Sequence, residues 1–120
     1  MRVHTRPFIL MIHPTLVDGA HAPSAPSRLG ITVTKKVGNA VARNRIKRVL
    51  REVFRLERRL FPPGFDFVVV AKRGLDPVHL DDVRQELRGT RTAIERATRK
   101  ALQRFQDSEA RRAASVSSSP

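Results

Sequence analysis

The chain has 120 residues, no cysteine, and 24 lysines and arginines against 11 aspartates and glutamates, which gives a formal net charge of +13. The absence of cysteine excludes a disulfide framework, a thiolate zinc site and a thiol nucleophile. The length allows one domain with a modest core, and the positive charge favours a polyanionic partner, nucleic acid before an acidic membrane surface. Because no apolar run approaches the roughly 20 residues of a membrane span and no signal-peptide pattern is visible, a cytoplasmic protein is predicted.

The first predicted elements are two strands separated by a loop. Residues 7–13 read PFILMIH, an apolar run that predicts a strand buried on both faces. Residues 18–27 are rich in Gly, Pro and Ser and predict an exposed loop. Residues 29–35 alternate apolar and polar side chains, which predicts a half-buried strand whose polar face carries Thr32 and Thr34.

A helix is predicted next, from Asn39 to about Leu60. Asn39 suits the N-cap position because its side chain can accept a hydrogen bond from a free amide of the first turn. Pro62 and Pro63 end the helix, since proline cannot continue it. Residues 65–71, FDFVVVA, are rich in β-branched side chains and predict a third strand.

The last predicted helix begins after Pro77, where Asp81 and Asp82 suit the positive end of a helix dipole. An apolar stripe runs along it and predicts core packing rather than a coiled-coil partner, with Gly89 as a candidate break. The stripe comprises Leu80, Val83, Leu87, Thr90, Ile94, Ala97 and Ala101. Residues 106–120 are small and polar without periodicity, which predicts a disordered tail after a single domain of residues 1–105.

The helix of residues 39–60 is amphipathic. With residues placed 100° apart, one arc is apolar and the opposite arc is almost purely cationic. The apolar arc comprises Ala42, Ile46, Val49, Leu50, Val53, Phe54, Leu56 and Leu60. Residues 35–60 hold ten lysines and arginines, and only Glu52 and Glu57 oppose them, whereas a merely solvated helix mixes the two signs.

This composition indicates phosphate binding. Arginine pairs two phosphate oxygens at once, and the free amides near Gly38 and Asn39 favour an anion. A helix between two strands argues against a helix-turn-helix, and the lack of Tyr and Trp argues against an aromatic base-stacking sheet. Composition alone therefore predicts a nucleic-acid binder without choosing between RNA and DNA.

The run KKVGNAVARNRIKRVLREVF resembles the signature of the bacterial ribonuclease P protein component. Its centre is Arg43-Asn44-Arg45, preceded by residues 35–40, and a later strand ends in Ala71-Lys72-Arg73. The resemblance covers residues 5–105. It implies an α+β fold, a small two-layer α-β sandwich in the order β-β-α-β-α, with a left-handed crossover between parallel strands. Composition could not predict that hand, because about 98% of such crossovers are right-handed.

The resemblance implies an accessory role in ribonuclease P. A large RNA would perform the Mg²⁺-dependent hydrolysis that removes the 5′ leader of precursor tRNA, holding most of the Mg²⁺. The protein would supply no catalytic or metal-ligating residue. Its partners would be the catalytic RNA and precursor tRNA, with no membrane and no obligatory protein partner. The residues carried over to contact with the catalytic RNA are Lys35, Lys36, Asn39, Arg43, Asn44, Arg45, Lys47, Arg48 and Arg51. Those carried over to a cleft for the single-stranded leader are Ile9, Met11, Thr32, Thr34, Lys72 and Arg73.

Two departures from the family pattern concern this cleft. Relatives usually begin with a helix whose spaced Phe residues form one wall, and the sequence here shows no such helix before its first strand. Relatives often place an aromatic residue where this chain has Met11. We expect the true N-terminus to lie upstream of Met1, because without that helix Phe8 and Leu10 would be uncovered.

Two other functions stay open. A protein nuclease would need Asp76, Asp81, Asp82 and Glu86 to bind a metal ion, although these residues also suit a helix start and no histidine joins them at a convincing spacing. A ribosomal or chaperone-like RNA binder would share the cationic helix and lack processing activity. Reconstitution with the catalytic RNA separates these alternatives.

Overall fold

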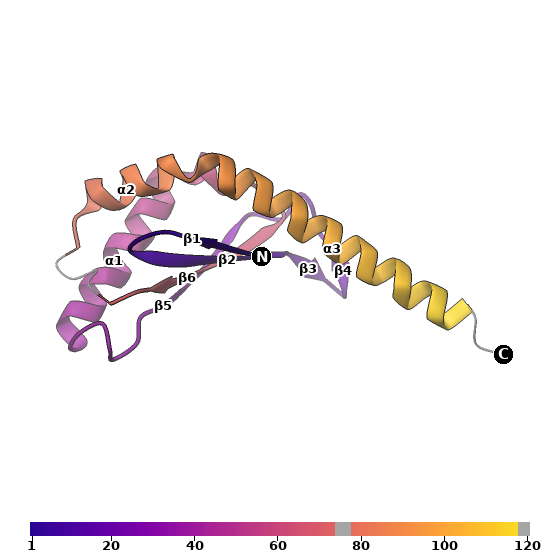
Figure 1. Ribbon diagram of the computed structural model, residues 1–120, viewed down its shortest axis with the longest axis horizontal. Coiled ribbons are helices and arrows are strands. Elements are labelled where there is room, and N and C mark those ends of the chain that lie inside the picture. The colour runs from indigo at the N-terminus through magenta and orange to yellow at the C-terminus, as the bar shows by residue number, and fades with distance from the viewer. Residues whose placement is uncertain (74–77, 118–120) are drawn as a thin grey trace.

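A computed structural model describes residues 1–73 and 78–117, with side chains described up to Ser115. Four strands form one sheet in the order β1-β2-β6-β5, and three helices cover it (Figure 1). The strands are β1 (Arg2–His4), β2 (Phe8–Pro14), β5 (Arg28–Thr32) and β6 (Phe65–Ala71), and a separate hairpin joins β3 (Leu16–Val17) to β4 (Ala20–His21). The helices are α1 (Ala40–Leu56), α2 (Leu80–Gly89) and α3 (Arg91–Ser117), with a 3-10 turn, η1 (Arg58–Leu60), after α1.

The sheet is mixed. β2 runs antiparallel to both β1 and β6, whereas β5 is parallel to β6, and α1 connects these two parallel neighbours. This arrangement confirms the predicted α+β class and the helix between two strands. Strand β1 and the β3–β4 hairpin were not predicted, because strands of two or three residues are too short to show an alternating pattern.

Within the described residues, the helices cover one face of the sheet. Every second side chain of β2 and of β6, including Leu10 and Phe67, is buried on the same face of the sheet. These side chains form a single core with buried residues from all three helices. The fully buried large side chains are Phe8, Leu10, Ile46, Val53, Phe67 and Ile94. The prediction that β2 is buried on both faces is therefore wrong. Its opposite face carries Met11, which is 37% exposed, because every helix packs on the other side.

The packing argument for an upstream helix also fails. Phe8 and Leu10, which were expected to lie uncovered without it, are 1% and 0% exposed. They belong to the core that Ile94, Ala97 and Ala101 of α3 complete, and α3 packs directly on β2. The covered face of β2 therefore needs no further element to shield it.

Helix α1 begins as predicted. The Asn39 side-chain oxygen accepts a hydrogen bond from the Ala42 amide at 2.9 Å, which caps the first turn. The helix ends at Leu56, earlier than the predicted Leu60, and Glu57 leads into η1. Leu56 is 39% exposed, so it does not belong to the buried side of the helix that the other residues of the predicted apolar arc form.

The predicted stripe on the last helix is confirmed, as is the break in it. Helix α2 ends at Gly89, and the Thr90 hydroxyl donates to the Leu87 carbonyl at 2.7 Å before α3 starts. Val83, Leu87, Ile94, Ala97 and Ala101 are buried, and Leu80 and Thr90 are half-buried. The two helices therefore turn at Thr90 (Figure 1), and the buried residues of both belong to one core.

Helix α3 continues through most of the segment that was expected to be disordered. It reaches Ser117, and its C-terminal half projects beyond the sheet (Figure 1). Residues 106–115 contain three Ala and two Arg, which favour helix, and extending an existing helix avoids the nucleation that an isolated one requires. Residues 118–120 lie outside the described part of the chain.

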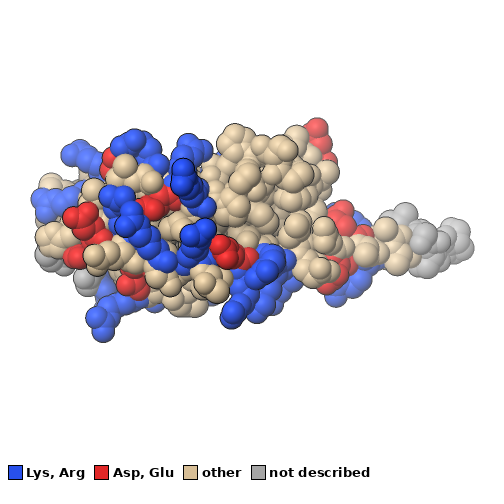
Figure 2. Space-filling view, turned by 90° about the horizontal axis from the view of Figure 1, so that it is seen from above, with Lys and Arg blue, Asp and Glu red and all other residues tan. Residues whose placement is uncertain are grey.

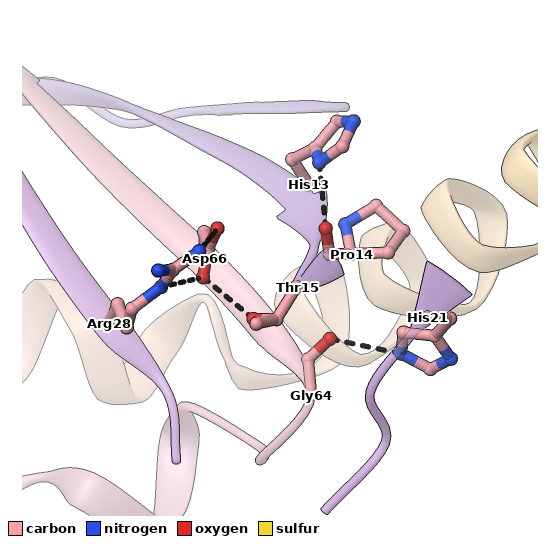
Figure 3. A network of polar contacts seen from close by, with 7 residues as sticks. All are labelled: His13, Pro14, Thr15, His21, Arg28, Gly64 and Asp66. Carbon is pink, nitrogen blue, oxygen red and sulfur yellow. Dashed lines mark hydrogen bonds and ion pairs between the residues drawn. The ribbon is translucent and has the colours of Figure 1, made fainter. Parts of the chain in front are cut away.

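Gly64 connects the start of β6 to the loop before β5 through backbone hydrogen bonds. It lies beside the polar network of Figure 3. Its amide donates to the Ala25 carbonyl at 2.7 Å, and its carbonyl accepts from the Thr15 amide at 2.8 Å and from His21 Nε2 at 3.0 Å (Figure 3). Its φ of +86° favours glycine, and a Cβ there would lie 2.9 Å from the Pro23 backbone.

We therefore expect Gly64→Ala to lower the free energy of unfolding by about 1–3 kcal/mol, measured by urea denaturation. Gly89→Ala is the matched control, because a Cβ at this helical position meets nothing within 4 Å. The control should leave stability unchanged or raise it by up to about 1 kcal/mol. Equal stability of the two variants would contradict the strain assigned to Gly64.

Candidate nucleic-acid interface

The outward face of α1 presents a row of cations on a rigid support. Ile46, Leu50 and Val53 are buried and hold the helix against the core. Around the opposite side, Asn44, Arg45, Arg48 and Arg51 are exposed, and Arg43 and Lys47 are half-buried at the margins. An open groove runs along this side and is lined by Asn44, Lys47, Arg48, Arg51, Glu52 and Arg55. The predicted cationic face is therefore formed as the periodicity indicated.

Most of these cations are unpaired. Within the described residues, no carboxylate forms an ion pair with Arg43, Arg45, Lys47, Arg48 or Arg51. The Nε of Arg43 is buried and has no hydrogen-bond partner among the described residues, which costs free energy in the free protein. Only toward the C-terminal end does a carboxylate intervene, where Glu52 pairs with Arg55. The first three turns of α1 thus keep their charge available to a ligand.

Glu57 is turned away from this face. Its Oε1 accepts from Arg84 Nε at 2.9 Å and pairs with Arg88 Nη2 at 2.8 Å, and its side chain is only 12% exposed. These hydrogen bonds, first from Arg84 and then from Arg88, lower the pKa of Glu57. Glu57 therefore fixes the end of α1 to α2 and also removes a negative charge from the cationic face.

We expect Glu57→Gln to lower the free energy of unfolding at pH 7 by about 1 kcal/mol. Because folding lowers the pKa of Glu57, its contribution is complete above the ordinary glutamate pKa and is lost as the pH falls through the lowered value. The gap between wild type and variant should therefore narrow in acid, measured by urea midpoints at neutral and acid pH. Glu95→Gln, which removes a much more exposed partner of Arg91, is the control and should lower the free energy of unfolding at pH 7 by less. A constant gap across the pH range would show that the pair does not stabilise α1.

The remaining predicted RNA contacts lie at the start of α1. Lys35 and Lys36 are exposed in the turn before the helix, and Asn39 is its exposed N-cap. They add positive charge beside the free amides of the first turn. Viewed from above, lysines and arginines spread over the half of the molecule farther from the C-terminus, with fewer acidic side chains among them (Figure 2). All nine predicted RNA-contacting residues thus lie on one helix or in the turn that precedes it.

Three of the predicted leader-cleft residues share the uncovered face of the sheet. Across the sheet, Val70 of β6 pairs in register with Ile9 of β2 on one side and with Thr32 of β5 on the other. Two residues along, Met11 of β2 pairs with Val68 of β6. Val68 and Val70 were missed, because β6 carries apolar residues at nearly every position, and Asp66 is the one polar residue of the strand that marks their face. Ile9, Met11, Val68 and Val70 form an apolar strip with polar residues at its edges.

Thr34, Lys72 and Arg73 lie at one end of that strip. β5 and β6 are parallel and end there, and β2 begins there, since Phe8 faces Ala71. Thr34 and Arg73 are exposed. Lys72 is half-buried, and its ammonium donates to the Thr5 carbonyl, so it closes the β1–β2 turn instead of pointing freely outward. Helix α1 starts after the same end of β5. The predicted RNA contacts at the start of α1 and the predicted leader-cleft residues therefore lie near the same end of the strands (Figure 1).

No metal-binding cluster of three or more His, Asp or Glu is present within residues 1–73 and 78–117. Asp81 and Asp82 are exposed in the first turn of α2, as expected of helix-start residues, and Asp76 lies outside the described residues. His79 is the exposed N-cap of α2 and makes no side-chain capping hydrogen bond. Among the described helices, none is both long and apolar enough to cross a membrane.

Comparison with known proteins identifies the family. The profile of the family described as Ribonuclease P matches residues 1–96. The chain belongs to the ribonuclease P protein family. The ribonuclease P protein component of Syntrophus aciditrophicus is 53% identical over 75 residues, which cover 62% of this chain and 62% of that protein. The component of Oleidesulfovibrio alaskensis is 60% identical over 62 residues, half of each chain. The aligned part thus spans between half and two thirds of these curated relatives.

Solved ribonuclease P proteins share the fold. The protein from Thermotoga maritima superposes with a TM-score of 0.62 at 31% identity, over 74% of this chain and 78% of that one. The Staphylococcus aureus protein gives a TM-score of 0.59 at 29% identity, over 74% of this chain and 75% of that one. The predicted family and fold class are therefore confirmed. The roles assigned to individual residues stay predictions.

Proposed function

We propose that the chain is the protein subunit of the ribonuclease P ribonucleoprotein. It binds the catalytic RNA through the outward face of α1 and the 5′ leader of precursor tRNA on the uncovered face of the sheet. In this way it assists the Mg²⁺-dependent endonucleolytic cut that gives the mature tRNA 5′ end. The observation that carries the proposal is the row of cations on α1 that pair with no described carboxylate, in a chain that belongs to this family.

The α1 face suits folded RNA more than a diffuse polyanion. Arg45, Arg48 and Arg51 lie on one side of a helix whose other side is buried, so their backbones are fixed before RNA arrives. Preorganised arginines lose less conformational freedom on binding than those of a flexible tail. Contacts to phosphate fix the position of the protein without reading sequence, as assembly on one large RNA requires.

The uncovered sheet face suits a single-stranded leader of variable sequence. Its strip of Ile9, Met11, Val68 and Val70 offers apolar contact to any base and few groups that could read a base edge. Met11 supplies a flexible, polarizable side chain where relatives often have an aromatic ring. We therefore infer leader binding that depends on apolar contact and nearby charge more than on stacking.

The inferred Mg²⁺ would be held mainly by the RNA. The carboxylate on the uncovered face, Asp66, already accepts hydrogen bonds from Arg28 at 2.8 and 2.6 Å and from Thr15 at 2.6 Å (Figure 3). The arginines of α1 would offset repulsion between RNA strands, a task that Mg²⁺ and other cations in solution otherwise perform. The protein should therefore matter most when Mg²⁺ is scarce.

Reconstitution tests the proposal. Precursor-tRNA cleavage by ribonuclease P RNA is measured at low Mg²⁺ with and without the protein, and stimulation by the protein is expected. Protein alone should cleave nothing, and cleavage without RNA would favour the protein nuclease. RNA binding without stimulation would favour a ribosomal or chaperone-like binder.

A further inference from the structure

A second cationic groove lies between β1 and α3. Its lining residues are Met1, Arg2, Val3, His4, Ala93, Arg96, Ala97 and Lys100, and its volume is about 310 Å³. Val3 and Ala97 are buried and form the floor. β1 is one edge strand of the sheet and β5 is the other, and α1 packs beside β5. The groove and the cationic face of α1 therefore lie at opposite edges of the sheet.

The wall formed by α3 is a row of like charges. Arg96, Lys100 and Arg104 follow one another at four-residue steps, so they lie on one side of the helix over about 12 Å. Arg104 lines the adjoining hollow beside Met1 and His13. Within the described residues none of the three forms an ion pair, whereas Arg91, toward the other side of α3, pairs with Glu95. Such a row weakens a helix unless a ligand offsets it.

The wall formed by β1 supplies backbone donors. Met1 and Ile12 exchange hydrogen bonds, and the Thr5 amide donates to the Phe8 carbonyl. The backbone N–H and C=O groups of the odd-numbered residues therefore point toward β2. By the alternation of an antiparallel ladder, the amides of Arg2 and His4 point to the free edge. An uncovered strand edge is normally protected or occupied by a partner.

We propose that this groove binds a second stretch of RNA backbone, so that the protein contacts RNA at both edges of its sheet. The proposal rests on the proposed function, because it assumes an RNA partner already held by α1. Three cations without carboxylates match a chain of phosphates, and the edge amides add neutral donors. An acidic peptide fits less well, because β1 offers a ladder of only three residues to an added strand.

Charge reversal at neighbouring positions tests the groove. Lys100 lines it, whereas Arg99 is exposed on another side of α3, forms no ion pair with a described residue and does not line the groove. Lys100→Glu and Arg99→Glu change the net charge equally, so only the position of the charge differs. Binding is measured against salt concentration in two arms, one with ribonuclease P RNA and one with precursor tRNA.

We expect Lys100→Glu to weaken binding about tenfold more than Arg99→Glu in one arm and to flatten the salt dependence by about one unit of slope. The arm that responds identifies which RNA occupies the groove. Equal losses for the two variants in both arms would overturn the proposal, as would binding of a polyglutamate peptide that neither RNA displaces. The Arg45→Ala/Arg48→Ala variant in the same assay separates this result from failure of the proposed function. Wild-type RNA affinity of that double variant would mean that α1 does not hold the RNA, whereas weakened binding of the double variant with equal losses for Lys100→Glu and Arg99→Glu would refute the groove alone.

A cysteine-free chain allows the location to be checked directly. Ala93→Cys, on the groove wall, and Ser24→Cys, in an exposed loop, each introduce a single thiol for a photo-crosslinker. The thiol at position 93 should give an RNA crosslink, and the thiol at position 24 should give less. Crosslinks of equal yield, or none from position 93, would count against RNA in the groove.

Discussion

Replacing Arg45 and Arg48 together by alanine is expected to weaken the proposed assembly with ribonuclease P RNA on the order of a hundredfold. Both side chains are exposed on α1 and form no ion pair with a described carboxylate, so in the free protein their loss breaks no contact that holds the fold. Each charged contact to phosphate contributes about tenfold in affinity. The logarithmic salt dependence should also fall by about two units of slope, one for each phosphate contact removed.

The matched control is Arg91→Ala with Arg112→Ala. It removes the same two charges, but from exposed arginines of α3 that already pair with Glu95 and Glu109. Assembly is measured by filter binding or anisotropy over a range of salt, and the free energy of unfolding of both variants is measured by urea. Equal loss of affinity in the two double variants would mean that net charge alone, and not the face of α1, binds the RNA.

The cationic face was predictable because its determinants are local. The 3.6-residue period separates Ile46, Leu50 and Val53 from the arginines, and Asn39 marks the first turn within the same stretch. The same holds for the stripe on α2 and α3 and for its break at Gly89. Each of these features depends on residues within a few turns of one another, which is the range over which a sequence pattern carries information.

The uncovered face of the sheet was not predictable for a related reason. Ile9 and Met11 stand in an unbroken apolar run, and so do Val68 and Val70. Only one polar residue on each strand, His13 on β2 and Asp66 on β6, marks the side away from the helices, which is too weak a pattern to assign the face. The answer depends on where α1, α2 and α3 pack, and those contacts join residues far apart in the chain. For this part of the site, the resemblance to a family supplied Ile9 and Met11, whereas the sheet register adds Val68 and Val70.

The remaining differences between prediction and structure concern segments that are short or lack an apolar pattern. Strand β1 has three residues and too little sequence for a pattern, yet it forms one wall of the second groove. Residues 106–117 lack an apolar stripe, and helix formation there follows from continuity with the packed part of α3. Composition indicates correctly that residues 106–115 join no core, but a segment that continues a packed helix needs no core contacts of its own.

Phe67→Ala is expected to lower the free energy of unfolding by about 3–5 kcal/mol, a large fraction of the stability of a small domain. Phe67 lies in the central strand β6, facing Ile12 of β2 and Leu29 of β5, and is 0% exposed. Its ring meets Phe61 edge to face at 5.0 Å, and Phe61 in turn meets Phe54 of α1 at 4.6 Å. The truncation therefore opens a cavity where sheet and helix join, which neighbouring side chains in a packed core fill only in part.

Urea denaturation checks this prediction, with Phe105→Ala as the control. Phe105 is half-buried on α3, so the same truncation there should remove less packing and lower stability by clearly less. At a temperature where Phe67→Ala is still folded, its affinity for RNA should match that of wild type, because the arginines of α1 are unchanged. A variant that is fully folded and yet binds weakly would show that the aromatic cluster also sets the position of the cationic face. That outcome would place part of the binding energy in the packing beneath α1 and not only in the charges above it.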